Sequence, residues 1–103
     1  MEVKKLRVFD LEEMVPEVKA NVFYDVDEFS SRLIKLPPGA EIPSCEMETY
    51  VLFYVISGEI KVTVDEEQEK LEEQKCLVTD PATLSMKSDE GAKILGVQIE
   101  KKG

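Results

Sequence analysis

Short runs in which apolar and polar residues alternate make up most of this chain, and such alternation is typical of half-buried β-strands. The clearest example is residues 60–65, where Ile60, Val62 and Val64 share one face and polar side chains share the other. The other predicted strands are bounded by glycine, proline or acidic residues and lie at 3–9, 20–26, 29–36, 51–56, 76–79 and 93–99. Short strands at roughly even spacing predict an all-β sandwich or barrel.

Turn signals separate these strands. Pro37-Pro38-Gly39 ends the strand at 29–36, because proline cannot donate a hydrogen bond to a sheet. Asp10-Leu11-Glu12-Glu13 has the form of a capping box, so we expect one short N-terminal helical turn that ends before Pro16. The acidic residues 66–69 predict a solvated hairpin loop.

Length and charge limit the class of protein. The chain has 103 residues, enough for one hydrophobic core, and we predict a single domain over residues 1–103. The net charge of −9 argues against a nucleic-acid partner, because such binding depends on clustered Lys and Arg. The longest apolar run, 51–56, is far shorter than a membrane-spanning helix, and the start of the chain lacks the apolar core of a signal peptide. We therefore expect an acidic cytoplasmic protein with no membrane partner.

Cysteine and histidine usage restricts the chemistry. The two cysteines, Cys45 and Cys76, do not make a disulfide framework in a chain expected in the cytoplasm, so we expect free thiols. Histidine is absent altogether. The chain therefore lacks the side chain that most often serves as general base, proton switch or metal ligand.

An extended segment and a compact apolar strand lie between Gly39 and Gly58. This stretch resembles the first sequence motif of the cupin family, which runs Gly, five residues, His, one residue, His, three or four residues, Glu, six residues, Gly. Both glycines are present. Cys45 and Met47 stand at the two His positions, and Val51 stands at the Glu position.

The second cupin motif is matched less well. It runs Gly, five residues, Pro, one residue, Gly, two residues, His, three residues, Asn. Pro81 matches, whereas Lys75 and Thr83 replace the two glycines, Met86 stands at the His position and Glu90 stands at the Asn position.

The resemblance extends from about residue 29 to residue 99 and implies a double-stranded β-helix, or jelly-roll barrel. It also implies a homodimer joined through exchanged edge strands. In the family, the four motif residues hold a divalent metal between the two sheets. A thiol, two thioethers and a valine do not suit such a metal, so we do not expect a typical metal-dependent cupin enzyme.

The substituted positions have two interpretations. In the first, they fill the barrel interior with adaptable apolar side chains where an ion was lost. In the second, Cys45, Met47 and Met86 form a soft site for monovalent copper, which thiolate and thioether ligands favour. The candidate ligand pocket comprises the substituted positions and two neighbours expected on strand faces: Cys45, Met47, Val51, Phe53, Met86 and Arg32.

Arg32 shares a predicted strand face with Ile34 and Leu36. Its guanidinium is expected to pair either with a carboxylate of a ligand or with a surface glutamate. The sequence thus favours a metal-free binding or regulatory domain for a small apolar or weakly polar ligand, or a structural role with no ligand. The alternatives are a copper-binding cupin and a metal-independent isomerase-type enzyme, which would need an acid/base pair from Tyr, Lys and carboxylates. We assign no catalytic residue and no cofactor other than this copper alternative.

Overall fold

The computed structural model describes residues 6–12 and 21–100, and this part of the chain contains nine β-strands and no helix. The strands are β1 (Asn21–Asp25), β2 (Phe29–Leu36), β3 (Glu41–Glu46), β4 (Tyr50–Gly58), β5 (Ile60–Val64), β6 (Glu67–Leu71), β7 (Cys76–Thr79), β8 (Thr83–Lys87) and β9 (Ala92–Ile99). The all-β prediction is confirmed. Within the same ranges, no helix is long and apolar enough to cross a membrane.

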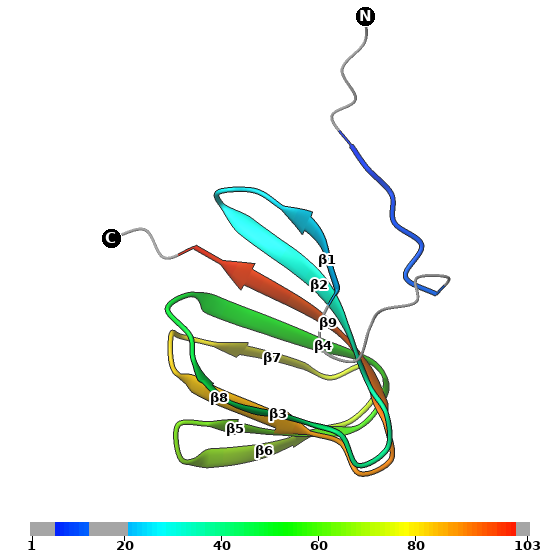
Figure 1. Cartoon of the computed structure of the whole chain (residues 1–103), viewed down its shortest axis with the longest axis vertical. Helices are drawn as coiled ribbons and strands as arrows, with labels where there is room; N and C mark the ends of the chain where they lie inside the picture. The colour runs from blue at the N-terminus through cyan, green and yellow to red at the C-terminus, as the bar shows by residue number, and fades with distance from the viewer. Residues whose placement is uncertain (1–5, 13–20, 101–103) are drawn as a thin grey trace, which may run out of the picture.

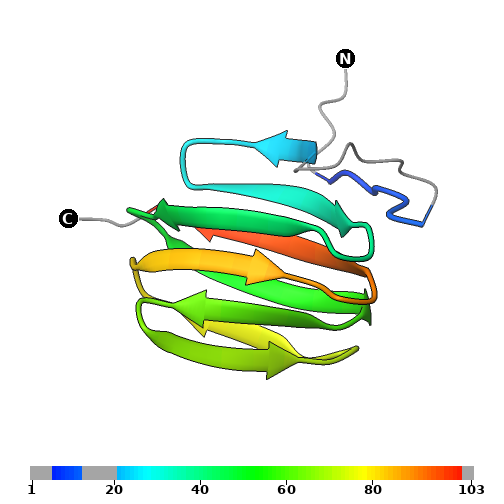
Figure 2. The same ribbon diagram turned by 60° about the horizontal axis from the view of Figure 1, so that its bottom comes forward.

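The strands form two antiparallel sheets that face each other in a jelly-roll arrangement (Figures 1 and 2). The five-stranded sheet has the order β1-β2-β9-β4-β7, and the four-stranded sheet has the order β3-β8-β5-β6. The connections β2–β3, β4–β5 and β8–β9 gather at one end of the molecule (Figure 1). Strands that are neighbours in a sheet are therefore often distant in the sequence.

The hydrophobic core lies between the sheets. It is made of inward-facing side chains from both layers, namely Ile34, Leu36, Val55, Ile60, Val62, Leu71, Met86, Ala92 and Ile94. The alternation predicted for residues 60–65 is confirmed, because Ile60 and Val62 are at most 1% exposed and Val64 is half-buried.

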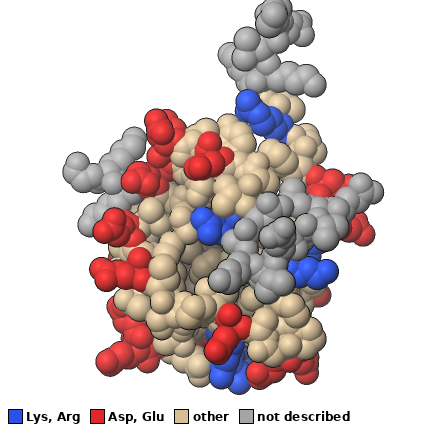
Figure 3. Space-filling view, viewed as in Figure 1, with Lys and Arg blue, Asp and Glu red and all other residues tan. Residues whose placement is uncertain are grey.

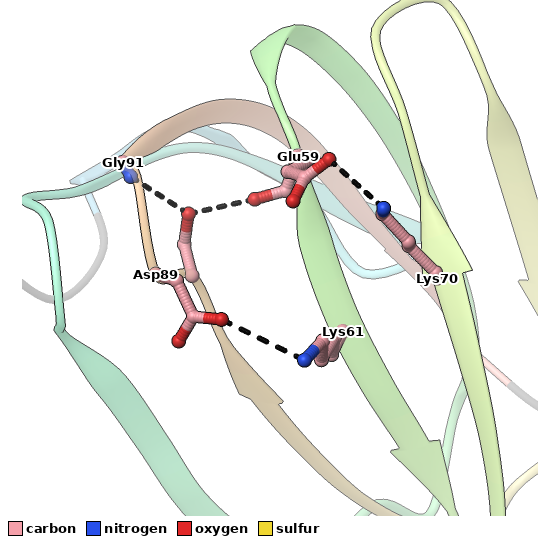
Figure 4. Close-up of polar contacts among 6 residues, drawn as sticks. Glu59, Lys61, Lys70, Asp89 and Gly91 are labelled. Atoms are coloured by element: carbon pink, nitrogen blue, oxygen red, sulfur yellow. Dashed lines mark hydrogen bonds and ion pairs between the residues drawn. The ribbon is translucent and has the colours of Figure 1, made fainter.

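Ser88 ties the three gathered connections together. Its side chain is buried, and its Oγ donates a hydrogen bond of 2.6 Å to the carbonyl of Glu59 and accepts one of 2.9 Å from the amide of Gly91. Its backbone exchanges hydrogen bonds with the β2–β3 connection, from Gly39 N and to Ala40 O. Two ion pairs lie at the same end (Figure 4): Lys61 with Asp89 at 3.6 Å, and Lys70 with Glu59 at 3.4 Å.

The prediction of an acidic loop over residues 66–69 was wrong. Residues 67–71 form β6, which pairs with β5 along its whole length, so the turn contains only Asp65 and Glu66. Asp65 has a φ of 54°, and its Oδ1 accepts a hydrogen bond of 3.0 Å from the amide of Thr83. A short polar side chain such as that of Asp tolerates this left-handed conformation better than most.

The beginning of the chain differs from the prediction where it is described. Residues 6–9 of the expected strand at 3–9 are not in a strand, and residues 3–5 lie outside the described ranges. Asp10 Oδ1 accepts a hydrogen bond of 3.1 Å from the amide of Glu12. Glu13 and the rest of the expected helical turn also lie outside the described ranges.

Candidate functional site

A pocket of about 480 Å³ opens between the two sheets. One side of it is lined by β2, β4 and β9 of the five-stranded sheet. The other side is lined by β3 and β8 of the four-stranded sheet and by Ala40 and Met47, which flank β3. The lining is mostly apolar: Arg32, Ile34, Leu36, Ala40, Glu41, Ile42, Pro43, Ser44, Cys45, Met47, Phe53, Leu84, Ser85, Met86 and Gln98. Figure 3 shows a hollow near the middle of one face, with acidic side chains mostly along the outline.

A β-bulge in β3 shapes one wall of this pocket. Ile42 pairs with Met86 and Cys45 pairs with Leu84, so β3 spans three residues where β8 spans two. Residues that pair across a sheet share a face, so Ile42 and Cys45 both face inward. Regular alternation would place these two residues on opposite faces. The bulge therefore brings the Cys45 side of the edge strand to the pocket.

Five of the six predicted pocket residues line this one pocket: Arg32, Cys45, Met47, Phe53 and Met86. Val51 does not line it. Its side chain is 1% exposed and lies in β4 between its partners Thr79 of β7 and Gln98 of β9. Three of the four substituted motif positions, Cys45, Met47 and Met86, therefore line one cavity, and the binding of a ligand there stays a prediction.

The sulfur atoms lie at different depths. Met86 is buried, Met47 is half-buried, and Cys45 is exposed on the edge strand. The only carboxylate in the pocket lining is Glu41, which is exposed. In the described ranges, no three Cys, Asp or Glu side chains cluster as a metal site. A thiol, two thioethers and a valine do not match the imidazole and carboxylate donors of a divalent cupin metal, so this donor set does not fit that metal.

Arg32 lies against a glycine in the middle of the five-stranded sheet. Gly96 of β9 pairs with Arg32 on one side and Phe53 on the other. A Cβ added at Gly96 would lie 3.2 Å from Arg32 Cγ and 3.4 Å from Phe53 Cε1. The missing side chain therefore gives the stem of Arg32 and the ring of Phe53 the room to lie beside each other in the pocket wall.

The guanidinium of Arg32 has no hydrogen bond or ion pair with the residues that the structure describes. Its Nε is buried and has no hydrogen-bond partner, and no ion pair forms between Arg32 and the carboxylates of the described residues. The alternative in which Arg32 pairs with a surface glutamate is therefore not what the structure shows. Arg32 remains a charged donor at the border of a largely apolar cavity.

Gln98 lines the pocket and was not among the residues predicted for it. It follows Ala92, Ile94 and Gly96 on the inner face of β9 and is the only residue of that face with a polar side chain. Extending the alternation of the last strand to its end would have found it, because every second residue of a strand shares one face. Ile42 was missed for a different reason, since the bulge that turns it inward with Cys45 has no clear sequence signal.

Comparisons with known proteins agree with this fold. The sequence matches the cupin domain family over residues 32–86, more than half of the chain. No curated protein matches it. A conserved Streptococcus pyogenes protein of unknown function has a similar structure, with a TM-score of 0.79, 17% identity, and coverage of 98% of this chain and 93% of the other.

Two further solved structures share the fold. An RmlC-like cupin from Methanocaldococcus jannaschii with a double-stranded β-helix has a TM-score of 0.78 and 16% identity, over 95% of this chain and 94% of the other. A variant of oxalate decarboxylase from Bacillus subtilis has a TM-score of 0.66 and 22% identity, over 71% of this chain and 21% of the other. At these identities the likeness concerns the fold, which hosts both enzymes and proteins of unknown function.

Proposed function

The chain belongs to the cupin domain family, and from that premise we propose that it binds a small apolar or weakly polar molecule between its sheets, as a binding or regulatory domain, without a divalent metal. The observation that carries this proposal is the pocket of about 480 Å³ at the family's ligand positions. That volume is within the range of small-molecule sites, which are mostly apolar with a few placed polar groups. A filled core would leave no such space.

The pocket favours binding over an isomerase-type reaction. Acid/base catalysis without histidine needs Tyr, Lys or carboxylates within hydrogen-bond reach of the substrate. No Tyr or Lys is among the residues that line the pocket, and Glu41 is its only carboxylate. The other proton-transfer group of the lining is the thiol of Cys45, and like Glu41 it is exposed, so the pocket offers no buried acid/base pair.

Binding of monovalent copper is the second candidate function. One observation favours it: Cys45, Met47 and Met86 line the same pocket, and such sulfur ligands select this ion. The weakness of this candidate is the spread of the three side chains from the buried floor to the exposed edge strand.

Titration with indole, an uncharged probe, tests the small-molecule proposal. We expect saturable amide chemical-shift changes at pocket-lining residues in a ¹H–¹⁵N spectrum. Ile42→Trp should abolish them by filling the cavity, whereas Leu6→Trp, at a side chain that is 70% exposed, should preserve them. Equal shifts in both variants, or no shifts in the wild type, would contradict binding in this pocket.

A competition titration of the reduced protein with monovalent copper and a chelator tests the second candidate. Tight binding of one ion per chain that is lost in both Cys45→Ser and Met86→Leu would support a copper site. Binding that survives both substitutions, or no binding, would exclude it.

A further inference from the structure

We propose that the molecule bound between the sheets is a monocarboxylate with an apolar body, and that Arg32 binds its carboxylate group. This inference rests on the proposed function and names the chemical class of its ligand. It follows from the unpaired guanidinium and from the chemistry of the surfaces on its two sides.

The missing partner of Arg32 indicates the charged group of the ligand. Buried polar groups in folded proteins nearly always have a hydrogen-bond partner, and an unsatisfied one needs an explanation. The buried Nε of Arg32 has none within the described chain. A guanidinium donates in a planar fork that matches the two oxygens of a carboxylate, so a carboxylate is its natural partner.

The charges around two cavities indicate where the carboxylate binds. Arg32 and Gln98 border two cavities, the main pocket and a smaller one of about 280 Å³. The smaller cavity is also lined by Asp25 and Glu100, so an anion there would meet two negative charges. The lining of the main pocket contains only one carboxylate, that of Glu41, and this side chain is exposed and solvated. An anion is therefore better accommodated on the side of the main pocket.

The walls beside Arg32 indicate the rest of the ligand. Beside Arg32 the wall continues with Ile34 and Leu36 of the same strand, and Phe53 lies across Gly96. Apolar walls exclude water, which strengthens the attraction between a guanidinium and a carboxylate. The Gln98 side chain adds an amide that donates hydrogen bonds on the same side. A carboxylate at one end and a hydrocarbon body at the other match this distribution.

The experiment compares octanoate with octanamide, which have the same apolar chain and differ in charge. Binding is measured from amide shifts of pocket residues in a ¹H–¹⁵N titration. We expect octanoate to bind the wild type at least ~10-fold more tightly, since hydrogen bonds to charged groups are the stronger ones. In Arg32→Gln, the affinity for octanoate should fall to that for octanamide.

Arg7→Gln is the matched control. Arg7 is the only other arginine in the chain, is exposed, and donates a hydrogen bond of 3.3 Å to the hydroxyl of Tyr24. This variant should keep the wild-type preference for octanoate. Binding of octanamide by Arg32→Gln would show that the pocket is still formed, and the wild-type comparison does not depend on either variant.

The outcomes separate this inference from the proposed function. Equal binding of the two probes by the wild type would overturn the carboxylate inference and leave the small-molecule proposal standing. A preference for octanoate that persists in Arg32→Gln would also overturn it, because another group would then bind the anion. If neither probe shifts the pocket residues, the carboxylate inference fails, and the indole titration decides the small-molecule proposal.

Discussion

Gly58 and Gly39, the two glycines that frame the first motif, both have a positive φ, 81° and 82°, but only one lacks space for a side chain. A Cβ at Gly58 would overlap the carbonyl oxygen of Gly91 and lie 2.8 Å from Ala92 Cα, whereas nothing lies within 4 Å of one at Gly39. Gly39→Ala should therefore lower the unfolding free energy only by the left-handed strain, about 1–2 kcal/mol. Gly58→Ala, which also displaces backbone, should lower it by about 3–5 kcal/mol. Urea denaturation measures both, and equal losses would mean that the Gly58 and Gly91 turns move apart at little cost.

Part of the candidate site was predictable from the sequence, because the two glycines define the spacing of the motif. Once Gly39 and Gly58 are aligned, Cys45 and Met47 take positions that lie in the pocket of the structure. The exposure of Cys45 was not predictable, because it depends on β3 being an edge strand. The unpaired state of Arg32 was not predictable either, since it depends on which carboxylates of distant strands come within reach of the side chain.

The hydroxyl of Ser88 bonds the β8–β9 connection to the β4–β5 connection and to its own Gly91, so its loss should destabilise this end of the barrel. Ser88→Ala leaves the Glu59 carbonyl and the Gly91 amide without their hydrogen bonds to Oγ. We expect a loss of about 2–3 kcal/mol in unfolding free energy, because buried groups left unpaired carry their full desolvation cost. Ser57→Ala, at an exposed residue of β4, is the control and should change stability little. Thermal or urea unfolding of both variants checks this, and similar stabilities would mean that water replaces the hydroxyl.

Strands with two-sided patterns were predicted better than strands with polar surfaces. The prediction at 29–36 coincides with β2, and the one at 60–65 differs from β5 by one residue. The polar sequence of β6, Glu-Gln-Glu-Lys-Leu, was interpreted as a loop. This strand lies at the edge of its sheet, and only Leu71 is buried. This segment is a strand because its backbone pairs with β5, and the alternation of side chains does not reveal such pairing.

At the scale of the whole molecule, a row of apolar side chains is exposed on the outer face of the five-stranded sheet. Ile99 of β9 pairs with Phe29 of β2 and with Tyr50 of β4, so the three side chains share that face. They are 42%, 38% and 37% exposed, and Val78 of the edge strand β7 is 66% exposed. Adjacent exposed apolar side chains of this kind often mark an interaction surface. A second copy of this chain is the occupant that we expect, through a contact of sheet faces rather than the exchanged edge strands that the family resemblance implies.

Charge sets the conditions under which such a dimer forms. Each chain carries a net charge of −9, so two copies repel one another, while contact of the apolar faces favours association. Because salt screens this repulsion, the dimer should tighten as NaCl rises from about 50 mM to about 500 mM. Sedimentation equilibrium should give a mass twice the 11.7 kDa of one chain. Ile99→Glu should weaken the dimer, whereas Val8→Glu, at a residue of the N-terminal segment that is 87% exposed, should not. A dimer that loosens with salt would instead indicate an interface of ion pairs, and a monomer under all conditions would remove the second copy as the occupant of this face.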